Sequence, residues 1–109
     1  MPSNLDYCPL ARALNVVGDR WTVLILRDLF QARAARFQEF LDDLPGLGPN
    51  TLADRLKKLE SEGVVARRFY SEHPPRAEYF LTKKGWELGP VLLALLAWGE
   101  KHMMDSESD

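Results

Sequence analysis

Residues 36–85 read RFQEFLDDLPGLGPNTLADRLKKLESEGVVARRFYSEHPPRAEYFLTKKG, and the order of elements in this stretch decides the fold. Apolar residues in 37–44 recur at the spacing of a short amphipathic helix, which the Pro-Gly pair at 45–46 ends. Gly48 suits the cap of a second helix. One side of that helix is predicted to be buried, through Leu52, Leu56 and Leu59 at i, i+4 and i+7.

The opposite side of the second helix is polar and cationic. Thr51, Arg55 and Lys58 repeat the spacing of the leucines, and Pro49 and Asn50 occupy the exposed first turn. Arginine bonds bidentately to guanine and asparagine to adenine in the major groove, and a helix amino terminus favours a phosphate. The pattern indicates a DNA-recognition helix, and a solvated polar face on a core helix is the alternative.

A basic hairpin is predicted after this helix. Gly63 ends the helix, and the next residues are β-branched and aromatic. Strands are expected at 64–70 and 77–81, around a turn at 71–76. The basic residues bordering the hairpin, placed to reach a phosphate backbone or minor groove, are Arg67, Arg68 and Arg76. Two helices followed by such a hairpin predict a DNA-binding winged helix-turn-helix with a two-stranded wing.

Two further helices are expected before this stretch. Cys8 suits the cap of the first, which Gly18 ends. Asp19 suits the N-cap of the next, whose apolar stripe only Asp28 interrupts. Residues 31–35 are predicted to be a connection.

The carboxyl-terminal region is apolar beyond what a small core absorbs. Residues 86–98 contain two tryptophans and five leucines, and Gly89-Pro90 should kink or break the helix that they form. A partner chain would cover the excess apolar surface. We therefore expect a mainly helical α+β fold, a winged helix-turn-helix with dimerisation helices at both ends.

Length and charge bound the organisation. The chain has 109 residues, enough for one domain, which we place at 8–103 between a flexible amino-terminal arm (1–7) and a disordered acidic tail (104–109). The net charge is −2, but residues 55–84 hold eight Lys/Arg against four Glu, which leaves +4 there and −6 elsewhere. No apolar run approaches the roughly 18 residues of a membrane span, and no signal peptide is evident, so a cytoplasmic protein is expected.

Several motifs together carry a family resemblance. They are Cys8-Pro9-Leu10, Gly18-Asp19-Arg20-Trp21, Arg36-Phe37, Leu44-Pro45-Gly46, Leu52 to Leu59, Pro74-Pro75-Arg76-Ala77-Glu78-Tyr79, Leu81-Thr82 and Gly85. In this order and spacing the chain resembles the HxlR-type regulators over about residues 7–103. The resemblance implies a dimeric bacterial winged-helix transcription factor, a repressor or an activator.

The resemblance also implies how two copies would pair. First and last helices of the family pair across the dimer, which implicates Leu10, Leu14, Leu92, Leu95 and Trp98. A two-fold pair would hold its recognition helices about one DNA turn, ~34 Å, apart and so bind an inverted-repeat operator. Alternatively, the carboxyl-terminal stripe belongs to the core of a single chain.

Cys8 is the candidate for sensing an input. The positive end of a helix dipole favours a reactive thiolate, whereas a thiol buried at the interface is the alternative. Relatives in the resembled family answer thiol-reactive stress through the matching cysteine. Because Cys8 is the single cysteine, oxidation would give an intersubunit disulfide, a mixed disulfide or a sulfenic acid.

A small-molecule effector is the other kind of input, and the three tryptophans could line its pocket or simply belong to the core.

Other classes of function fit the residues less well. His73 and His102 have no evident pairing with Cys8 or with a carboxylate, and one cysteine with two distant histidines lacks metal-ligand spacing, so we expect no catalytic site, metal or cofactor. A winged-helix protein-interaction module without DNA binding remains the competing function.

Arg20 is a further expected phosphate contact, unless it pairs with Asp19 or Asp28.

Overall fold

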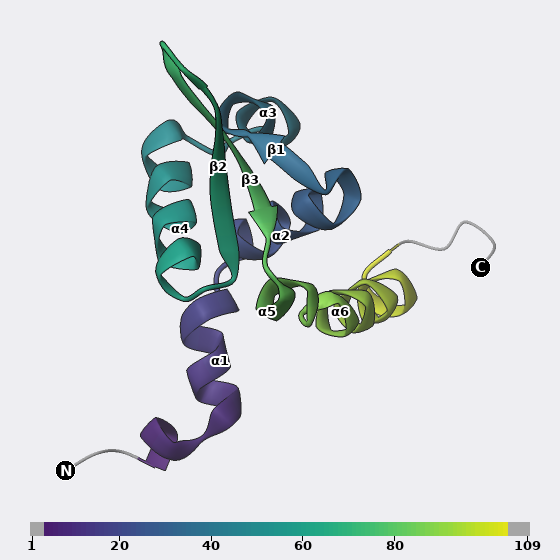
Figure 1. The fold of residues 1–109 in the computed structure, drawn as a ribbon. Coiled ribbons are helices and arrows are strands. Elements are labelled where there is room, and N and C mark those ends of the chain that lie inside the picture. The colour runs from purple at the N-terminus through teal and green to yellow at the C-terminus, as the bar shows by residue number, and fades with distance from the viewer. Residues whose placement is uncertain (1–3, 105–109) are drawn as a thin grey trace.

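Six α-helices and one three-stranded sheet follow one another along residues 4–104, the part of the chain that the computed structural model describes (Figure 1). The helices are α1 (Pro9–Val17), α2 (Arg20–Ala32), α3 (Phe37–Asp43), α4 (Pro49–Ser61), α5 (Lys83–Trp86) and α6 (Gly89–His102). The strands are β1 (Ala34–Arg36), β2 (Val65–Glu72) and β3 (Pro75–Leu81). A 3-10 helix, Asn4–Tyr7, precedes α1 within the expected amino-terminal arm. Residues 1–3 of that arm and 105–109 of the expected tail lie outside the described residues.

Side-chain caps begin three of the helices. The Asp19 carboxylate accepts a hydrogen bond from the Thr22 amide at 2.9 Å, and the Thr82 hydroxyl accepts one from the Gly85 amide at 3.1 Å. The Asp19 cap agrees with the sequence prediction. At α3 the Glu39 carboxylate accepts a hydrogen bond from the Arg36 amide at 2.8 Å. The third residue of the helix thus gives the backbone amide of the residue before the helix a hydrogen-bond partner.

The sheet is antiparallel with strand order β1-β3-β2, so the wing is a β2–β3 hairpin with a third strand along β3. The sequence prediction of a connection at 31–35 was wrong at both ends. α2 extends to Ala32, and β1 pairs Ala35 with Tyr79. The predicted turn at 71–76 is also too long, because the strands continue to Glu72 and from Pro75 and leave two residues between them.

Two glycines allow the hairpin to leave α4 and reach α5. Gly63 has a φ of +74°, a conformation that costs glycine little and lets the chain reverse between α4 and β2. A Cβ on Gly85 would lie 2.2 Å from the Val64 carbonyl oxygen. Glycine is therefore required at 85 if α5 is to pack against the start of the hairpin.

The core lies where α2, α3, α4 and the base of the hairpin meet. Leu52, Leu56 and Leu59 of α4 are at most 1% exposed, as their spacing predicted. The other fully buried large side chains are Phe40, Ile25, Leu26 and Leu29. The recognition-helix candidate is thus fixed to α2 and α3 by its apolar side.

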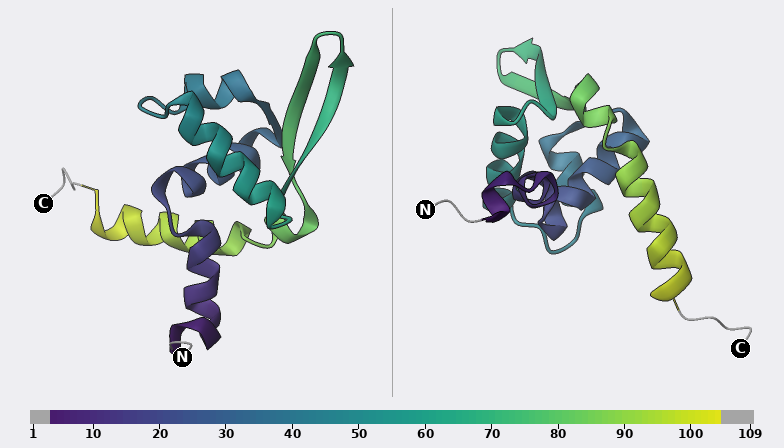
Figure 2. Two further views of the ribbon diagram at one scale, coloured as in Figure 1. Left: turned by 90° about the vertical axis from the view of Figure 1, so that its left-hand side faces the viewer. Right: turned by 90° about the horizontal axis from the view of Figure 1, so that it is seen from below.

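α1 and α6 leave this core in different directions (Figures 1 and 2). Neither helix has a buried residue. The helical region before α6 breaks as the sequence predicted: α5 ends at Trp86, and α6 begins at Gly89 with Pro90 in its first turn. Among the described residues, no helix is long and apolar enough to cross a membrane.

Asp28 is a charged residue inside the core. Its side chain is 7% exposed, and its Oδ1 accepts a hydrogen bond from the Arg27 Nη2 at 3.2 Å. Its Oδ2 has no hydrogen-bond partner among the described residues. Burial raises the pKa of Asp28 against the opposing effect of Arg27, and the nearby Asp43 carboxylate raises it further.

The substitution Asp28→Asn should therefore stabilise the fold by about 1 kcal/mol at neutral pH, because it removes a buried charge and leaves a side chain of nearly the same size. A pKa raised in the folded state means that the wild type loses stability as pH rises from the ordinary carboxyl pKa through the raised one. The stability gain of the variant should accordingly grow between pH 4 and pH 8 in urea unfolding. Asp42→Asn, at an exposed site of α3, is the control and should show no such growth. A variant less stable than wild type at pH 8 would contradict this account.

Candidate nucleic-acid interface

The outward side of α4 carries the polar residues that the sequence singled out. Pro49, Asn50 and Lys58 are exposed, and Thr51 and Arg55 are half-buried. Lys58 makes no side-chain ion pair with any residue of the described chain. The ammonium group of Lys58 is therefore available for an external anion.

The amino terminus of α4 is open to solvent. Gly48 caps the helix without a side-chain hydrogen bond, and Pro49 follows at the first position. The Leu52 amide makes the first hydrogen bond of the helix by donating to the Gly48 carbonyl at 3.0 Å. The amides of Asn50 and Thr51 precede that bond, so the helix end offers donors and a positive dipole to a phosphate.

Arg55 differs from its neighbours because its guanidinium is already engaged. Its Nε donates to the Asp19 Oδ2 at 2.7 Å, and its Nη1 donates to the Asp54 Oδ2 at 2.6 Å. Burial of Asp19 opposes ionisation, but hydrogen bonds from Arg55 and Thr22 outweigh it and lower the pKa of Asp19 to about 2. The bond with Asp19 raises the pKa of Arg55 in turn.

The two arginines on β2 also have acidic partners. The Arg67 Nε lies 3.4 Å from the Glu60 carboxylate on α4, and Arg68 donates to Glu78 on β3. Sequence reasoning missed both partners. The Arg68–Glu78 pair follows from cross-strand register, which places the two residues opposite each other. The Arg67–Glu60 pair depends on how β2 packs on α4, which the sequence pattern does not encode.

Aromatic side chains on the wing were missed as well. Phe69 is 55% exposed and Tyr70 is 46% exposed. The Arg67 guanidinium lies 5.4 Å from the Phe69 ring centre, and that of Arg36 lies 5.3 Å from the Tyr70 ring centre. The wing therefore presents cation-aromatic pairs as well as free charge.

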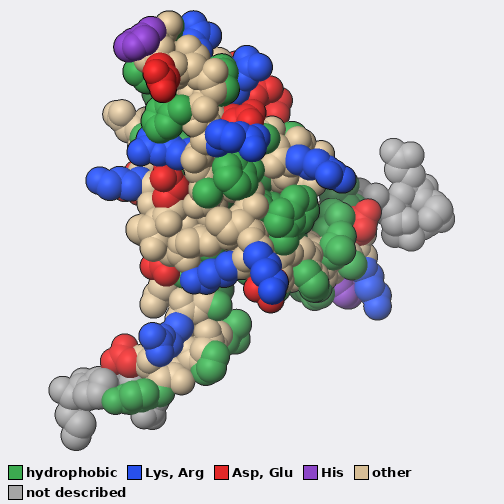
Figure 3. Space-filling view, in the orientation of Figure 1, with side chains coloured by type: hydrophobic (Ala, Val, Ile, Leu, Met, Phe, Trp, Pro, Cys, Tyr) green, Lys and Arg blue, Asp and Glu red, His purple; other side chains and the backbone are tan. Residues whose placement is uncertain are grey.

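Arg76 is exposed near the tip of the wing and makes no ion pair with another described residue. α4 and β2 run side by side in opposite directions and are joined by the three residues 62–64, so the start of α4 and the wing tip lie at the same end of the molecule (Figure 1). Lys and Arg side chains are interspersed with carboxylates on the face that Figure 3 shows. This end combines the open helix terminus with a basic hairpin.

Arg20, the other expected phosphate contact, is the exposed first residue of α2. Its guanidinium lies 5.2 Å from the Trp21 ring centre. The alternative partners that the sequence offered are engaged elsewhere, since Asp19 bonds Arg55 and Asp28 bonds Arg27.

Most residues expected at a dimer interface are exposed in the single chain. Leu10 and Leu14 on α1 are 69% and 53% exposed, and Leu95 and Trp98 on α6 are 54% and 59% exposed. Leu92 instead packs against the core and is half-buried. The apolar stripe of α6 is therefore mostly outside the core of the single chain.

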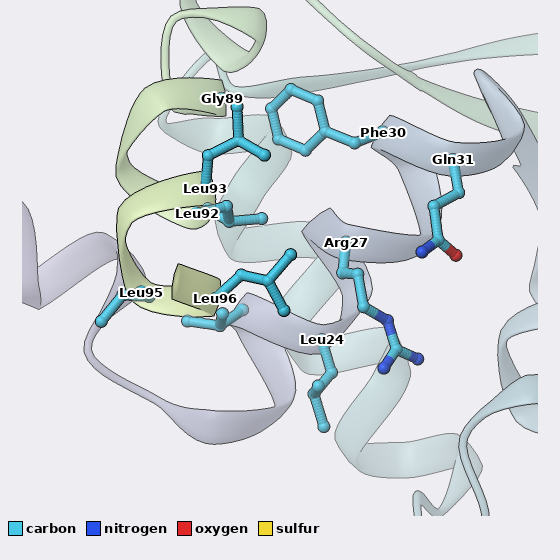
Figure 4. A pocket seen from close by; sticks show the side chains of 10 residues that line it. Leu24, Arg27, Phe30, Gln31, Gly89, Leu92, Leu93, Leu95 and Leu96 are labelled. Atoms are coloured by element: carbon cyan, nitrogen blue, oxygen red, sulfur yellow. The ribbon is translucent and has the colours of Figure 1, made fainter. Parts of the chain in front are cut away.

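A groove of about 510 Å³ runs between α2 and α6 (Figure 4). Its floor is formed by leucines of both helices and by Phe30, and its polar edge by Arg27 and Gln31. The three tryptophans do not line it together: Trp21 packs on the core, Trp86 contacts Phe30 edge-on, and Trp98 contacts His102.

Cys8 is the N-cap of α1, as predicted, and its thiol is free and half-buried. Its amide donates to the Leu5 carbonyl at 3.1 Å, which joins the 3-10 helix to α1. The thiol thus lies at the amino end of the same helix that exposes Leu10 and Leu14.

Comparison with known proteins agrees with this architecture. The family model for HxlR-like helix-turn-helix proteins matches residues 16–107. An HTH-type transcriptional regulator of Synechocystis, sll1512, is 42% identical over 88 residues, and the match spans 81% of this chain and 64% of that relative. The HTH-type regulator YdeP of Bacillus subtilis is 37% identical, over 91% of this chain and 77% of the relative.

A solved structure with the same fold is that of the redox regulator HypR in its reduced form. It superposes with a TM-score of 0.82 at 33% identity, over 87% of this chain and 93% of HypR. These relatives are transcription regulators and not enzymes, in agreement with the sequence prediction. The chain belongs to the HxlR-like helix-turn-helix family of transcriptional regulators.

Proposed function

We propose that this protein is a sequence-specific DNA-binding regulator that binds an inverted-repeat operator as a homodimer and represses or activates transcription. The observation that supports the proposal most is that the open amino terminus of α4 and the basic wing lie at one end of the molecule. α4 would enter the major groove, and the wing would lie over the adjacent backbone or minor groove.

The contacts divide by chemistry. Asn50 and Thr51, with the free amides of their helix turn, are placed for a base edge or a phosphate. Lys58 and Arg76 make no ion pair with another described residue, so these cations are suited to the DNA backbone. Arg67 and Arg68 would extend the basic edge of the wing after exchanging Glu60 and Glu78 for phosphates, and Arg20 would add a contact beyond α4.

Dimerisation would account for the exposed apolar faces of α1 and α6. A second copy covering Leu10, Leu14, Leu95 and Trp98 would remove large apolar side chains from water, each worth about 1.5–3 kcal/mol when fully buried. Leu92 would join the interface from its half-buried position.

An input would act through this dimer. Cys8 at the start of α1 is the candidate residue for reaction with a thiol oxidant or electrophile. The likeness of the whole chain to the redox regulator HypR supports that role. Modification there would move the helix that carries part of the interface. The apolar groove between α2 and α6 offers a place for a small-molecule effector.

DNA binding is tested by fluorescence anisotropy with DNA from the intergenic region upstream of the gene and with an unrelated duplex. We expect selective binding, and the logarithm of the association constant should fall linearly with the logarithm of the salt concentration. Lys58→Ala and Arg76→Ala should each weaken binding and lower the salt slope by about one. Lys101→Ala, an exposed cation on α6, is the control and should bind normally. A folded protein that binds neither duplex at low salt would favour the protein-interaction module instead.

The oligomeric state is tested by sedimentation of wild type, Leu10→Glu and Leu95→Glu. Wild type should sediment as a dimer, and each variant should shift toward monomer because a carboxylate would be buried at the interface. Phe69→Glu is a matched control, because Phe69 is as exposed as Leu95 but lies on the wing. Monomeric wild type at micromolar concentration would refute the homodimer.

The sensing role is tested by adding diamide or a quinone to the protein–operator complex. Wild type should lose operator affinity, and Cys8→Ser should keep it. Non-reducing gels and mass spectrometry would identify an intersubunit disulfide or a mixed adduct. Equal loss of binding in Cys8→Ser would show that the thiol is not the sensor.

A further inference from the structure

One carboxylate oxygen joins the start of α2 to the recognition-helix candidate. The Asp19 Oδ2 accepts hydrogen bonds from the Thr22 amide at 2.9 Å, the Thr22 hydroxyl at 2.7 Å and the Arg55 Nε at 2.7 Å. Asp19 is therefore both the N-cap of α2 and the anchor of a side chain from the middle of α4. The two residues are 36 positions apart in sequence, so the bond is a tertiary contact.

The pair is sheltered and doubly restrained. The side chains of Arg55 and Asp19 are 30% and 38% exposed. Asp54 holds the Nη1 of the same guanidinium at 2.6 Å, so two edges of the group are occupied. A guanine contact needs an arginine that presents two adjacent donors, and here the Nε donor is committed to Asp19 and an Nη1 donor to Asp54.

The pair also lies at the corner where α1 meets α2. Gly18 alone separates the end of α1 from Asp19, and its amide donates to the Leu14 carbonyl at 2.8 Å. A Cβ on Gly18 would lie 2.3 Å from that carbonyl oxygen. The corner is therefore closely packed, and a change in the orientation of α1 would also move Asp19.

We propose that Arg55 is a positioning residue, whose ion pair with Asp19 sets the angle of α4 relative to the α1–α2 corner, rather than a base-reading residue. This inference rests on the proposed DNA-binding function and deepens it. Asn50, Thr51 and Lys58 then make the contacts of α4, and Arg55 orients them. In a dimer, the pair sets how the two α4 helices are aimed at the half-sites.

Two readings of Arg55 make opposite predictions for Asp19→Asn. Asparagine caps helices as well as aspartate does, so this variant keeps the cap of α2 and removes only the charge that holds Arg55. If Arg55 is a DNA contact held back by Asp19, the variant should bind operator more tightly. If the pair positions α4, the variant should bind less tightly although it removes a negative charge from the DNA-binding side.

The experiment is a double-mutant cycle on the full-length protein, with Asp19→Asn, Arg55→Gln and the double variant titrated against operator DNA over a range of salt. We expect each single variant to lose about tenfold in affinity and the double variant to lose no more than either, because both remove the same interaction. Lys58→Gln is the matched control from the same helix. It should lower the salt slope by about one, and Arg55→Gln should leave the slope unchanged.

Melting curves and sedimentation of each variant restrict the comparison to folded dimers, and Asp19→Asn supplies the test if Arg55→Gln does not fold. Wild-type or tighter binding by Asp19→Asn would overturn the inference, as would a salt slope lowered by Arg55→Gln as much as by Lys58→Gln. Either result leaves the proposed function intact. Wild type that does not prefer the operator would overturn both.

Discussion

The packing of the α4 leucines on α2 is the contact on which the rest of the structure depends. Leu52, Leu56 and Leu59 are at most 1% exposed, and they meet Ile25 and Leu29 in one cluster. Because one side of α4 is committed to this contact, its other side has to face water. The same burial brings Arg55 to Asp19 and Glu60 to Arg67, so the ion pairs of the surface are consequences of the apolar contact.

A small core explains why α1 and α6 stand apart from it. The buried cluster draws on α2, α3, α4 and the hairpin, and neither α1 nor α6 contributes a buried residue. Such a chain leaves apolar helices in water unless something covers them. The structure thus separates a core that holds α4 and the base of the wing from two helical arms with exposed apolar faces, and Asp19 lies at the corner where α1 meets α2.

Local rules predicted much of this fold from sequence. The leucine spacing, Gly48 and Asp19 mark their helices because caps and periodicity act within a few residues. β1 was missed because a three-residue strand of Ala-Ala-Arg has no pattern and exists only through pairing with β3. For the candidate site, the sequence indicates the residue types but not which charged side chains are already in ion pairs. Whether Arg55 or Lys58 has an ion-pair partner depends on contacts distant in sequence, which composition and spacing do not record.

The register of the wing shifts between Phe69 and Ser71, which leaves Tyr70 without a partner on β3. Such a bulge bends and twists a hairpin beyond the irregularity while the ladder before it stays in register. The base of this wing, from Val65 to Phe69, is tied to the core through β3, whereas the tip from Ser71 to Arg76 is aimed by the bulge. Evolution could therefore lengthen, shorten or redirect the tip across related regulators, and so change the surface that the tip presents, without disturbing the buried cluster of the core.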